Sequence, residues 1–390
     1  MPKRIAILGS TGSIGRQALE VAREMAPDIS VVALSAHSNA DLLAGQGAEF
    51  GVRHFAIGDG NANDLAGKLP SGSKLYRGID GLCELASLPD VDLVVFAVFG
   101  AAGLRPLVAA IEAKKDIAFA CKEALVAGGE LVMNLARRNG VAFLPIDSEH
   151  NSIWRCMKGR DASSIRRIVL SATGGPFRGW TRDRLSAVTI NQTLAHPLWQ
   201  MGKRITVNSA TMMNKGLEII EAHHLFGLPS DKIGVVVHPE GVIHGFVELS
   251  DGSFLAHASP ADMKFPIRAC LAWPDEPRAD RPALDVSLFS GLAFESPDES
   301  VFAPLALARR ALTEDWSFAV ALNAANEVLV DRFLAGQIGF LSIIDGLLSA
   351  AESFHRHAGR PHTIDEVIAL DAEVRQSFES AGSIATGDIG

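Results

Sequence analysis

The pattern of hydrophobic and polar positions differs between two parts of the chain. In residues 4–146, short apolar runs are separated by longer segments with helical spacing. Short apolar runs rich in β-branched residues predict strands at 4–8, 30–34, 92–97, 116–120 and 141–145. Between them, apolar residues recur at helical spacing. The runs are almost continuously apolar, which is typical of parallel strands covered by helices on both faces. This pattern predicts an α/β fold whose N-terminal domain is a Rossmann-like, doubly wound parallel sheet.

From about residue 152 the pattern changes. Apolar runs at 168–172, 232–238 and 242–249 alternate with turn clusters and two predicted helices, which indicates a central α+β catalytic domain. A proline-rich passage around residues 273–282 precedes helical periodicity at 304–312, 318–334, 340–354 and 364–378. We therefore predict a first domain at 1–150, a catalytic domain at 151–285, a linker at 286–303 and a small α-helical domain at 304–390.

Composition and charge narrow the class of protein. A chain of 390 residues is longer than one hydrophobic core usually supports, which agrees with several domains. Its 48% hydrophobic and 21% charged residues indicate a folded chain rather than a disordered one. The formal net charge is −9 and lysine and arginine form no dense run, so neither a nucleic acid nor an anionic membrane is expected as a partner.

The cysteines and the N-terminus bear on location. Four cysteines lie far apart without CxxC spacing, which favours reduced thiols over a disulfide framework or a zinc site. We see no secretory signal at the N-terminus, and the longest apolar runs, such as residues 93–99, are too short to span a membrane. These features predict a cytoplasmic protein.

A glycine-spaced loop, GSTGSIG at residues 9–15, follows the first predicted strand and opens a helix. Glycines at such a turn let the backbone approach a pyrophosphate, and free N–H groups at the helix start bind its charge. A tight turn without a ligand uses the same residues. The position after the first strand of a doubly wound sheet favours a dinucleotide site.

The second predicted strand ends at His37, Ser38 and Asn39, where a site for NAD usually places an acid that binds the ribose hydroxyls. No acid stands there, which leaves room for a 2′-phosphate and favours NADPH over NADH. The alternative is a solvated loop that contacts no ligand.

Two acids follow the strand at 141–145. Asp147 and Glu149 are two residues apart, so on an extended chain their carboxylates would point the same way at the carboxyl edge of the sheet. Two carboxylates so close favour a cation between them, and oxygen ligands favour Mg²⁺ or Mn²⁺. Solvated surface acids are the alternative.

A second polar constellation lies between residues 196 and 218. Ser209, Asn214 and Lys215 could donate hydrogen bonds to a phosphate group, and Glu218 could supply a third carboxylate from a nearby helical face. The alternative is a polar loop that leads into a capped helix.

Successive motifs together carry a resemblance to a known family. They are GSTGSIG at residue 9, CKEALV at 121, DSEHN at 147, GGPF at 174, HPLWQMG at 196, SATMMNKGLE at 209 and LNAANE at 322. In this order the chain resembles the 1-deoxy-D-xylulose 5-phosphate reductoisomerases over nearly its whole length. The resemblance implies conversion of 1-deoxy-D-xylulose 5-phosphate to 2-C-methyl-D-erythritol 4-phosphate in non-mevalonate isoprenoid synthesis, with NADPH, Mg²⁺ or Mn²⁺, and a homodimer.

Position by position, the resemblance also implies the site residues. The metal ligands are Asp147, Glu149 and Glu218, and the catalytic residues are Lys122, Glu149 and His196. The substrate contacts are Lys122, Ser148, Glu149, Thr173, His196, Trp199, Ser209, Asn214, Lys215 and Glu218. The NADPH contacts are Thr11, Gly12, Ser13, Ile14, His37, Ser38, Asn39, Cys121, Glu123 and Gly202.

The resemblance suggests a mechanism and a lid. The metal would chelate the C3 hydroxyl and C2 carbonyl oxygens during a retro-aldol and aldol rearrangement, and NADPH would reduce the branched aldehyde. Lys122 would donate a proton or act as an electrostatic clamp. Residues 196–202 would form a lid, with Trp199 covering the sugar and Gly202 as its pivot, while His196 hydrogen-bonds substrate rather than metal. The remaining histidines that we considered are expected to be structural, namely His223, His224, His238 and His244.

The chain departs from the usual family pattern at five positions. Cys121 replaces Asn, Thr173 replaces Ser, Leu198 replaces Asn, Asn208 replaces Asp, and Ser38 stands where a basic residue often occurs. Alternatives to the implied reaction are a paralogous reductoisomerase or a dehydrogenase on a related sugar phosphate, or a non-catalytic NADPH sensor.

Overall fold

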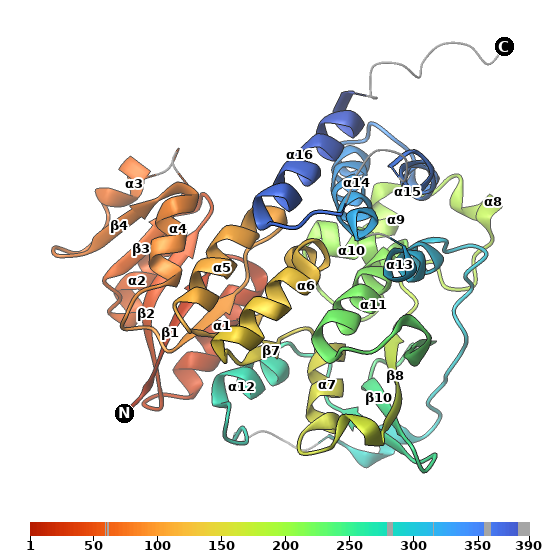
Figure 1. The fold of residues 1–390 in the computed structure, drawn as a ribbon, viewed down its shortest axis with the longest axis horizontal. Helices are drawn as coiled ribbons and strands as arrows, with labels where there is room; N and C mark the ends of the chain where they lie inside the picture. Colours follow the sequence, from red (N-terminus) through yellow and green to blue (C-terminus); the bar gives the residue numbers. More distant parts are fainter. Residues whose placement is uncertain (59, 61, 279–283, 315, 355–359, 381–390) are drawn as a thin grey trace. The chain divides into compact units, whose positions relative to one another are not determined.

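The computed structural model describes residues 1–390 except 59, 61, 279–283, 315, 355–359 and 381–390 (Figure 1). The chain divides into two compact units. The first comprises Met1–Ala124, Glu130–Arg155 and Asp262–Asp285, and the second comprises Leu125–Gly129, Cys156–Ala261 and Val286–Gly390.

A parallel sheet of seven strands forms the centre of the first unit. Its strands are β1 (Lys3–Leu8), β2 (Ile29–Ala36), β3 (His54–Ile57), β4 (Lys74–Arg77), β5 (Leu93–Phe96), β6 (Asp116–Phe119) and β7 (Phe143–Pro145). Their order across the sheet is β4-β3-β2-β1-β5-β6-β7, so the chain reverses direction across the sheet between β4 and β5. The loops after β1 and β5 therefore lie at a switch point, where doubly wound sheets bind ligands.

Alternation along the strands gives this sheet two apolar faces. Val95 belongs to a core that also contains Ile5, and the next residue on the same strand, Phe96, points to the other face. There Phe96, Phe119 and Phe143 pack ring against ring, with centroids 5.8 Å and 4.8 Å apart. Both faces are buried, as the continuous apolar runs of the sequence predict.

Helices follow most strands of the first unit. Those that begin there are α1 (Ser13–Glu24), α2 (Ala40–Phe50), α3 (Ala62–Ala66), α4 (Gly78–Ala86), α5 (Leu104–Glu112), α6 (Lys122–Asn139), α7 (Ser148–Met157) and α12 (Lys264–Ala272). Helix α12 comes from a distant part of the chain, and its Ile267 and Leu271 join the core formed by α1 and α2. Arg268 of α12 also forms an ion pair with Glu24 of α1.

The second unit contains a four-stranded mixed sheet. Its strands are β8 (Ile165–Ala172), β9 (Ile233–Val237), β10 (Ile243–Leu249) and β11 (Phe254–Ala258), in the order β11-β10-β8-β9. Strands β8 and β9 are parallel, whereas β10 is antiparallel to both β8 and β11. Such a sheet needs helices on only one side, and its strands carry both buried and exposed residues.

Helices make up the rest of the second unit. They are α8 (Arg182–Leu185), α9 (Ile190–Leu194), α10 (Lys203–Ala210), α11 (Met213–Phe226), α13 (Pro304–Thr313), α14 (Ser317–Leu334), α15 (Phe340–Phe354) and α16 (Ile364–Ser380). Helix α14 is buried along almost its whole length because α10, α15 and α16 all pack on it. Figure 1 shows α14 and α16 side by side.

The structure confirms the α/β fold class, with the parallel sheet, the second sheet and the C-terminal helices all present. The short strands β3, β4 and β11 were not predicted, and neither was the return of α12 to the first unit. The boundaries at 150, 285 and 303 stay a prediction. Part of the proline-rich passage and the end of the predicted helical domain lie outside the described residues. No described helix is long and apolar enough to cross a membrane.

Candidate active site

The glycine-spaced loop between β1 and α1 is built on close backbone contacts. Gly9 has a φ of +85°, and a Cβ there would lie 2.4 Å from the carbonyl oxygen of Ala97. At Gly15 a Cβ would lie 2.3 Å from the carbonyl oxygen of Gly9. Only glycine fits such contacts. Gly12 precedes α1 as its extended N-cap and is exposed together with Ser13, so the N–H groups at the helix start can be reached by an anion.

Polar contacts beneath this loop connect it to β2 and α2. The buried Ser10 hydroxyl donates to Oε1 of Gln46 at 2.7 Å, and the backbone N–H of Gly9 donates to Oγ of Ser35 at 3.0 Å. Thr11 and Ile14 are partly exposed above it. These contacts fix the backbone conformation, as a loop that presents N–H groups to a phosphate requires.

The three residues predicted at the adenosine end follow β2. His37, Ser38 and Asn39 are all exposed, and the Asn39 side chain accepts a hydrogen bond from the N–H of Leu42 at 3.0 Å. Asn39 thus caps α2. Its contact with NADPH stays a prediction.

Lys122 and Asp147 form an ion pair in the first unit. Lys122 is the first residue of α6, Asp147 follows β7, and Nζ lies 2.6 Å from the Asp147 carboxylate. Both side chains are largely buried. Burial alone would raise the pKa of Asp147, but the Lys122 ammonium and the neighbouring His150 hold that pKa well below its usual range. The carboxylate is therefore charged at neutral pH.

The carboxylates of Asp147 and Glu149 lie close together, although the prediction of an extended chain between them is wrong. Helix α7 begins at Ser148, so Asp147 immediately precedes the helix and Glu149 lies in its first turn. An acid is stabilised there by the helix dipole, which favours helix over strand at this point. An oxygen of each carboxylate nevertheless lies within 4.8 Å of the other, and the Ser148 hydroxyl donates to the Glu149 carboxylate.

Two predicted cofactor contacts lie at the start of α6. Cys121 and Glu123 are buried, and Sγ of Cys121 lies 3.8 Å from the carbonyl oxygen of Gly100 and 3.9 Å from Oε2 of Glu123. Burial raises the pKa of the Glu123 carboxyl group. The two side chains contact each other beside Lys122.

In the second unit, His196 organises the predicted lid. Its Nε2 lies 3.0 Å from the Thr173 hydroxyl, and its Nδ1 accepts hydrogen bonds from the N–H groups of Leu198 and Trp199 at 3.2 Å and 2.9 Å. Because Nδ1 accepts, the proton of the neutral ring lies on Nε2. Burial lowers the pKa of His196 and favours this neutral form. The Trp199 ring lies 6.2 Å from the ring of His244, and Gly202 caps α10 in an exposed, extended conformation.

The SATMMNKGLE segment forms the joint between α10 and α11. Ser209 lies near the end of α10, whereas Asn214, Lys215 and Glu218 lie on the first turns of α11. The Glu218 carboxylate accepts a hydrogen bond from Nδ2 of Asn214 at 2.5 Å and forms an ion pair with the buried Lys215. The segment therefore brings together an amide, an ammonium and a carboxylate. Their predicted roles toward a phosphate and a metal ion stay a prediction.

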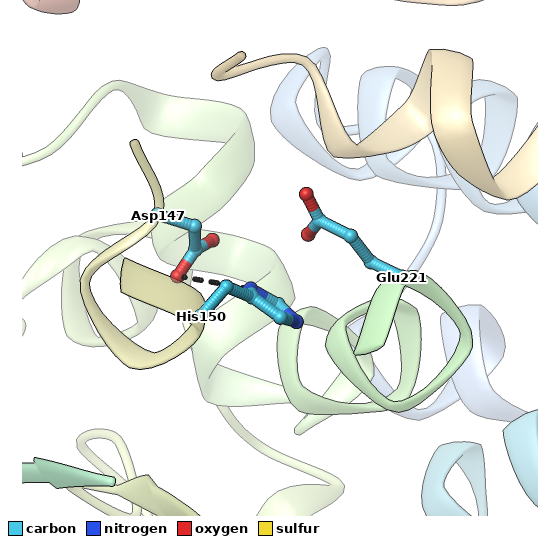
Figure 2. Close-up of side chains that lie close together, drawn as sticks. All are labelled: Asp147, His150 and Glu221. Atoms are coloured by element: carbon cyan, nitrogen blue, oxygen red, sulfur yellow. Dashed lines mark ion pairs between the residues drawn. The ribbon is translucent and has the colours of Figure 1, made fainter. Parts of the chain in front are cut away.

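Two buried polar residues escaped the sequence analysis. Figure 2 shows His150, whose Nδ1 lies 3.7 Å from Oδ1 of Asp147 and whose side chain is fully buried. The same figure labels Glu221, which lies on α11 of the second unit and is buried there. His150 follows Asp147 by three positions and Glu221 follows Glu218 by three. Helical spacing from the predicted ligands was the available signal.

Comparisons with known proteins agree with the motifs. A family model described as 1-deoxy-D-xylulose 5-phosphate reductoisomerase matches residues 5–129, and models of the C-terminal domains of that enzyme match residues 143–226 and 258–377. A protein of that name from Oleidesulfovibrio alaskensis is 46% identical over 96% of this chain and 93% of its own length. One from Thermoanaerobacter sp. (strain X514) is 43% identical over 96% of this chain and 98% of its own.

Solved structures agree as well. The reductoisomerase from Zymomonas mobilis in complex with NADPH superposes with a TM-score of 0.91 at 36% identity, over 98% of this chain and all of that one. A DOX-P reductoisomerase in complex with NADPH, fosmidomycin and magnesium has a TM-score of 0.93 at 36% identity, over 99% of this chain and all of that one. The chain belongs to the 1-deoxy-D-xylulose 5-phosphate reductoisomerase family.

Proposed function

We propose that this chain converts 1-deoxy-D-xylulose 5-phosphate to 2-C-methyl-D-erythritol 4-phosphate, with NADPH and a divalent metal ion as cofactors. The observation that carries the proposal is the close pair of carboxylates, Asp147 and Glu149, beside the Lys122 ammonium. It occurs in a chain that belongs to the reductoisomerase family and also contains the dinucleotide loop.

Asp147, Glu149 and Glu218 would hold the metal. Their donors are all carboxylate oxygens, which suit Mg²⁺ or Mn²⁺ better than a softer ion. The low pKa of Asp147 keeps that ligand charged. When bound, the metal supplies Lewis acidity to the oxygens of the substrate.

The loop at residues 9–15 would hold the NADPH phosphates, and the exposed residues after β2 would lie at the adenosine end. The backbone contacts of Gly9 and Gly15 leave the start of α1 uncovered, which suits a pyrophosphate. Cys121, Glu123 and Gly202 would lie near the rest of the cofactor. NADPH supplies the hydride.

The second unit would bind the sugar phosphate. Thr173, Ser209, Asn214 and Lys215 provide two hydroxyls, an amide and an ammonium, and all of them can donate hydrogen bonds to a phosphate. Ser148 is a further hydroxyl donor in the first unit. His196 would contact the substrate through Nε2, which lies 3.0 Å from the Thr173 hydroxyl, and Trp199 would cover the sugar and exclude water.

Lys122 and Glu149 would act directly on the reacting part of the substrate. The Lys122 ammonium can donate a proton or stabilise negative charge that develops on a substrate oxygen. The Glu149 carboxylate would bind a substrate hydroxyl as well as the metal. The Ser148 hydroxyl, which donates to Glu149, orients that carboxylate.

Replacement of Glu149 by Gln tests the proposal. The change removes a charge and keeps the shape, so turnover should fall by about 10²-fold or more, because metal ligation contributes several kcal/mol. The assay is Mg²⁺-dependent NADPH oxidation with 1-deoxy-D-xylulose 5-phosphate, with product NMR to show the branched skeleton. Glu112→Gln, on the exposed end of α5, is the matched control and should keep full turnover.

Three results would contradict the proposal. Full turnover of Glu149→Gln without added metal would exclude Glu149 as a ligand. NADPH binding without oxidation by the unaltered chain would indicate a sensor. A product with an unbranched skeleton would indicate a simple dehydrogenase.

We also propose a cytoplasmic homodimer. The four cysteines are thiols rather than disulfides, which suits a reducing compartment. Strand β11 lies at an edge of its sheet and starts with Phe254, which is 51% exposed, and Val286 is 77% exposed. Edge strands with exposed apolar residues are sites of association. Light scattering should give the mass of a dimer, and Phe254→Asp should lower it toward that of a monomer.

A further inference from the structure

The turn between α10 and α11 has an unfavourable backbone conformation. Helix α10 ends at Ala210 and α11 begins at Met213, and between them Met212 has a φ of +61°. Among the described residues, Met212 and Lys114 are the only non-glycine residues with a positive φ. Such a conformation persists only where surrounding contacts hold it.

This turn determines where the predicted phosphate ligands lie. Ser209 lies before the turn, and Asn214 and Lys215 lie after it, so their relative positions depend on the angle between two helices. The Thr211 hydroxyl within the turn donates to the carbonyl oxygen of Asn208 and accepts from the N–H of Met213. These contacts lie within the turn, so they do not fix α10 against the rest of the unit.

Two polar contacts fix α10 to α14. Nδ2 of Asn326 donates to Oδ1 of Asn208 at 3.1 Å, and both side chains are buried. One turn earlier on α10, Arg204 forms a bidentate ion pair with Asp331 at 2.6 Å and 2.5 Å. Since the numbering rises along α10 as it falls along α14, the two helices run antiparallel. Asn208 directly precedes Ser209.

Further hydrogen bonds hold this part of α14. Nδ2 of Asn323, one turn before Asn326, donates to Oε1 of Glu327 at 3.0 Å. Glu327 also forms an ion pair at 2.9 Å with Arg375 of α16, which pairs in turn with Asp371 at 2.6 Å. Helix α14 therefore contacts α16 through Glu327 and α10 through Asn326.

We propose that Asn208 and Asn326 are positioning residues for the phosphate site: their buried amide contact holds the strained α10–α11 turn so that Ser209, Asn214 and Lys215 converge on one phosphate group. The proposal rests on the proposed function for the identity of the substrate. It does not rest on that function for the phosphate chemistry, which the donor set supports by itself. A pair of neutral amides supplies this contact without burying a charge.

A cycle of conservative variants tests the pair. In Asn208→Asp, the new side chain still accepts from Nδ2 of Asn326, and in Asn326→Asp a rotated Asn208 amide can donate. Each single variant should keep the KM for the deoxyxylulose phosphate within about twofold. In the double variant two carboxyl groups face each other and no amide donor remains. We therefore expect the KM for the deoxyxylulose phosphate to rise about tenfold, while the KM for NADPH is unchanged.

Asn326→Ala and Leu329→Ala keep the test decisive if the double variant does not fold. Asn326→Ala removes the donor and should raise the substrate KM about tenfold. Leu329 lies on the same helix against Gly346 of α15, so Leu329→Ala should lower the melting temperature and leave KM unchanged. Equal effects of the two alanine variants on KM would mean general loosening and would overturn the proposal.

Calorimetric binding of inorganic phosphate provides a readout without turnover. We expect the Kd for phosphate to rise about tenfold in Asn326→Ala and to stay unchanged in Asn208→Asp. An unaltered Kd in Asn326→Ala, or no phosphate binding by the unaltered chain, overturns the positioning role. If the unaltered chain binds phosphate but does not turn over the deoxyxylulose phosphate, only the proposed function fails.

Discussion

The two units form their parts of the candidate site by different means. In the first unit, the dinucleotide loop depends on backbone geometry, because Gly9 and Gly15 sit where a Cβ would collide with a carbonyl oxygen. In the second unit, the region predicted to bind the phosphate depends on side-chain contacts such as Thr173 with His196 and Asn208 with Asn326. A site that depends on close backbone contacts requires one residue type, glycine, at each position. A site that depends on side-chain contacts requires two residues that match each other.

This difference also affects tolerance to substitution. The family departures at Thr173 and Asn208 fall on side-chain contacts, and both replacements keep a group that forms the same kind of hydrogen bond. No departure falls on the glycines of the loop. A side-chain pair can change in steps that keep its contact, but a backbone approach below 3 Å leaves no room for any other residue.

The largest expected effect concerns the backbone-built region. Gly9→Ala places a Cβ 2.4 Å from the Ala97 carbonyl oxygen at a φ of +85°, and the free energy of unfolding should fall by about 3 kcal/mol. Gly51→Ala is the matched control, since Gly51 also has a positive φ but has no atom within 4 Å of that position. Its cost should be about 1 kcal/mol. Urea unfolding measures both, and equal losses would show that the close contact is unimportant.

A second prediction concerns His224, a partly exposed residue of the second unit. The rings of His224 and Trp316 lie against Gly129, and burial, assisted by nearby His223, lowers the pKa of His224 to about 3. In the unfolded chain this pKa is about 6.5. The unfolded state therefore binds the proton first, so stability is full above about pH 6.5 and falls as the pH drops toward 3.

The second unit should consequently lose about 2 kcal/mol of stability between pH 7.5 and pH 5 through this group. Replacement of His224 by Gln should remove that part of the pH dependence, whereas His362→Gln, at an exposed position, should not. Urea unfolding at the two pH values gives the comparison. An unchanged slope in His224→Gln would show that other groups cause the acid sensitivity.

The same contrast explains what the sequence could predict. The apolar runs predicted β1, β2 and β5 to β7 and the C-terminal helices because long periodic patterns identify buried elements. Four-residue strands such as β3 and β4 carry too little pattern to be identified. The return of α12 to the first unit depends on contacts such as Arg268 with Glu24, which are 244 positions apart and leave no local signal.

The parts of the candidate site that form local sequence patterns were predictable, whereas contacts between distant residues were not. Glycine spacing and the acids near residue 147 are local, and so they were found. The extended conformation between Asp147 and Glu149 was wrong because α7 begins earlier than its apolar pattern suggests. The roles of Asn208 and Asn326 required the fold, since 118 positions separate them.

The smallest expected effect concerns a contact of the second unit that depends on a glycine, as the loop of the first unit does. Leu198 of the predicted lid lies on Gly241, where a Cβ would come within 2.4 Å of Cδ2 of Leu198. Gly241→Ala should displace the leucine and raise the KM for the deoxyxylulose phosphate about fivefold, which corresponds to about 1 kcal/mol.

Shortening the leucine should compensate. In Leu198→Ala/Gly241→Ala the new methyl group has room, so KM should return toward that of Leu198→Ala alone, although the φ of +59° at Gly241 still opposes alanine. Steady-state kinetics of the four chains measures the coupling between the two positions. If the two substitutions are additive, Gly241 does not seat the lid, and the second unit relies on side-chain contacts there too.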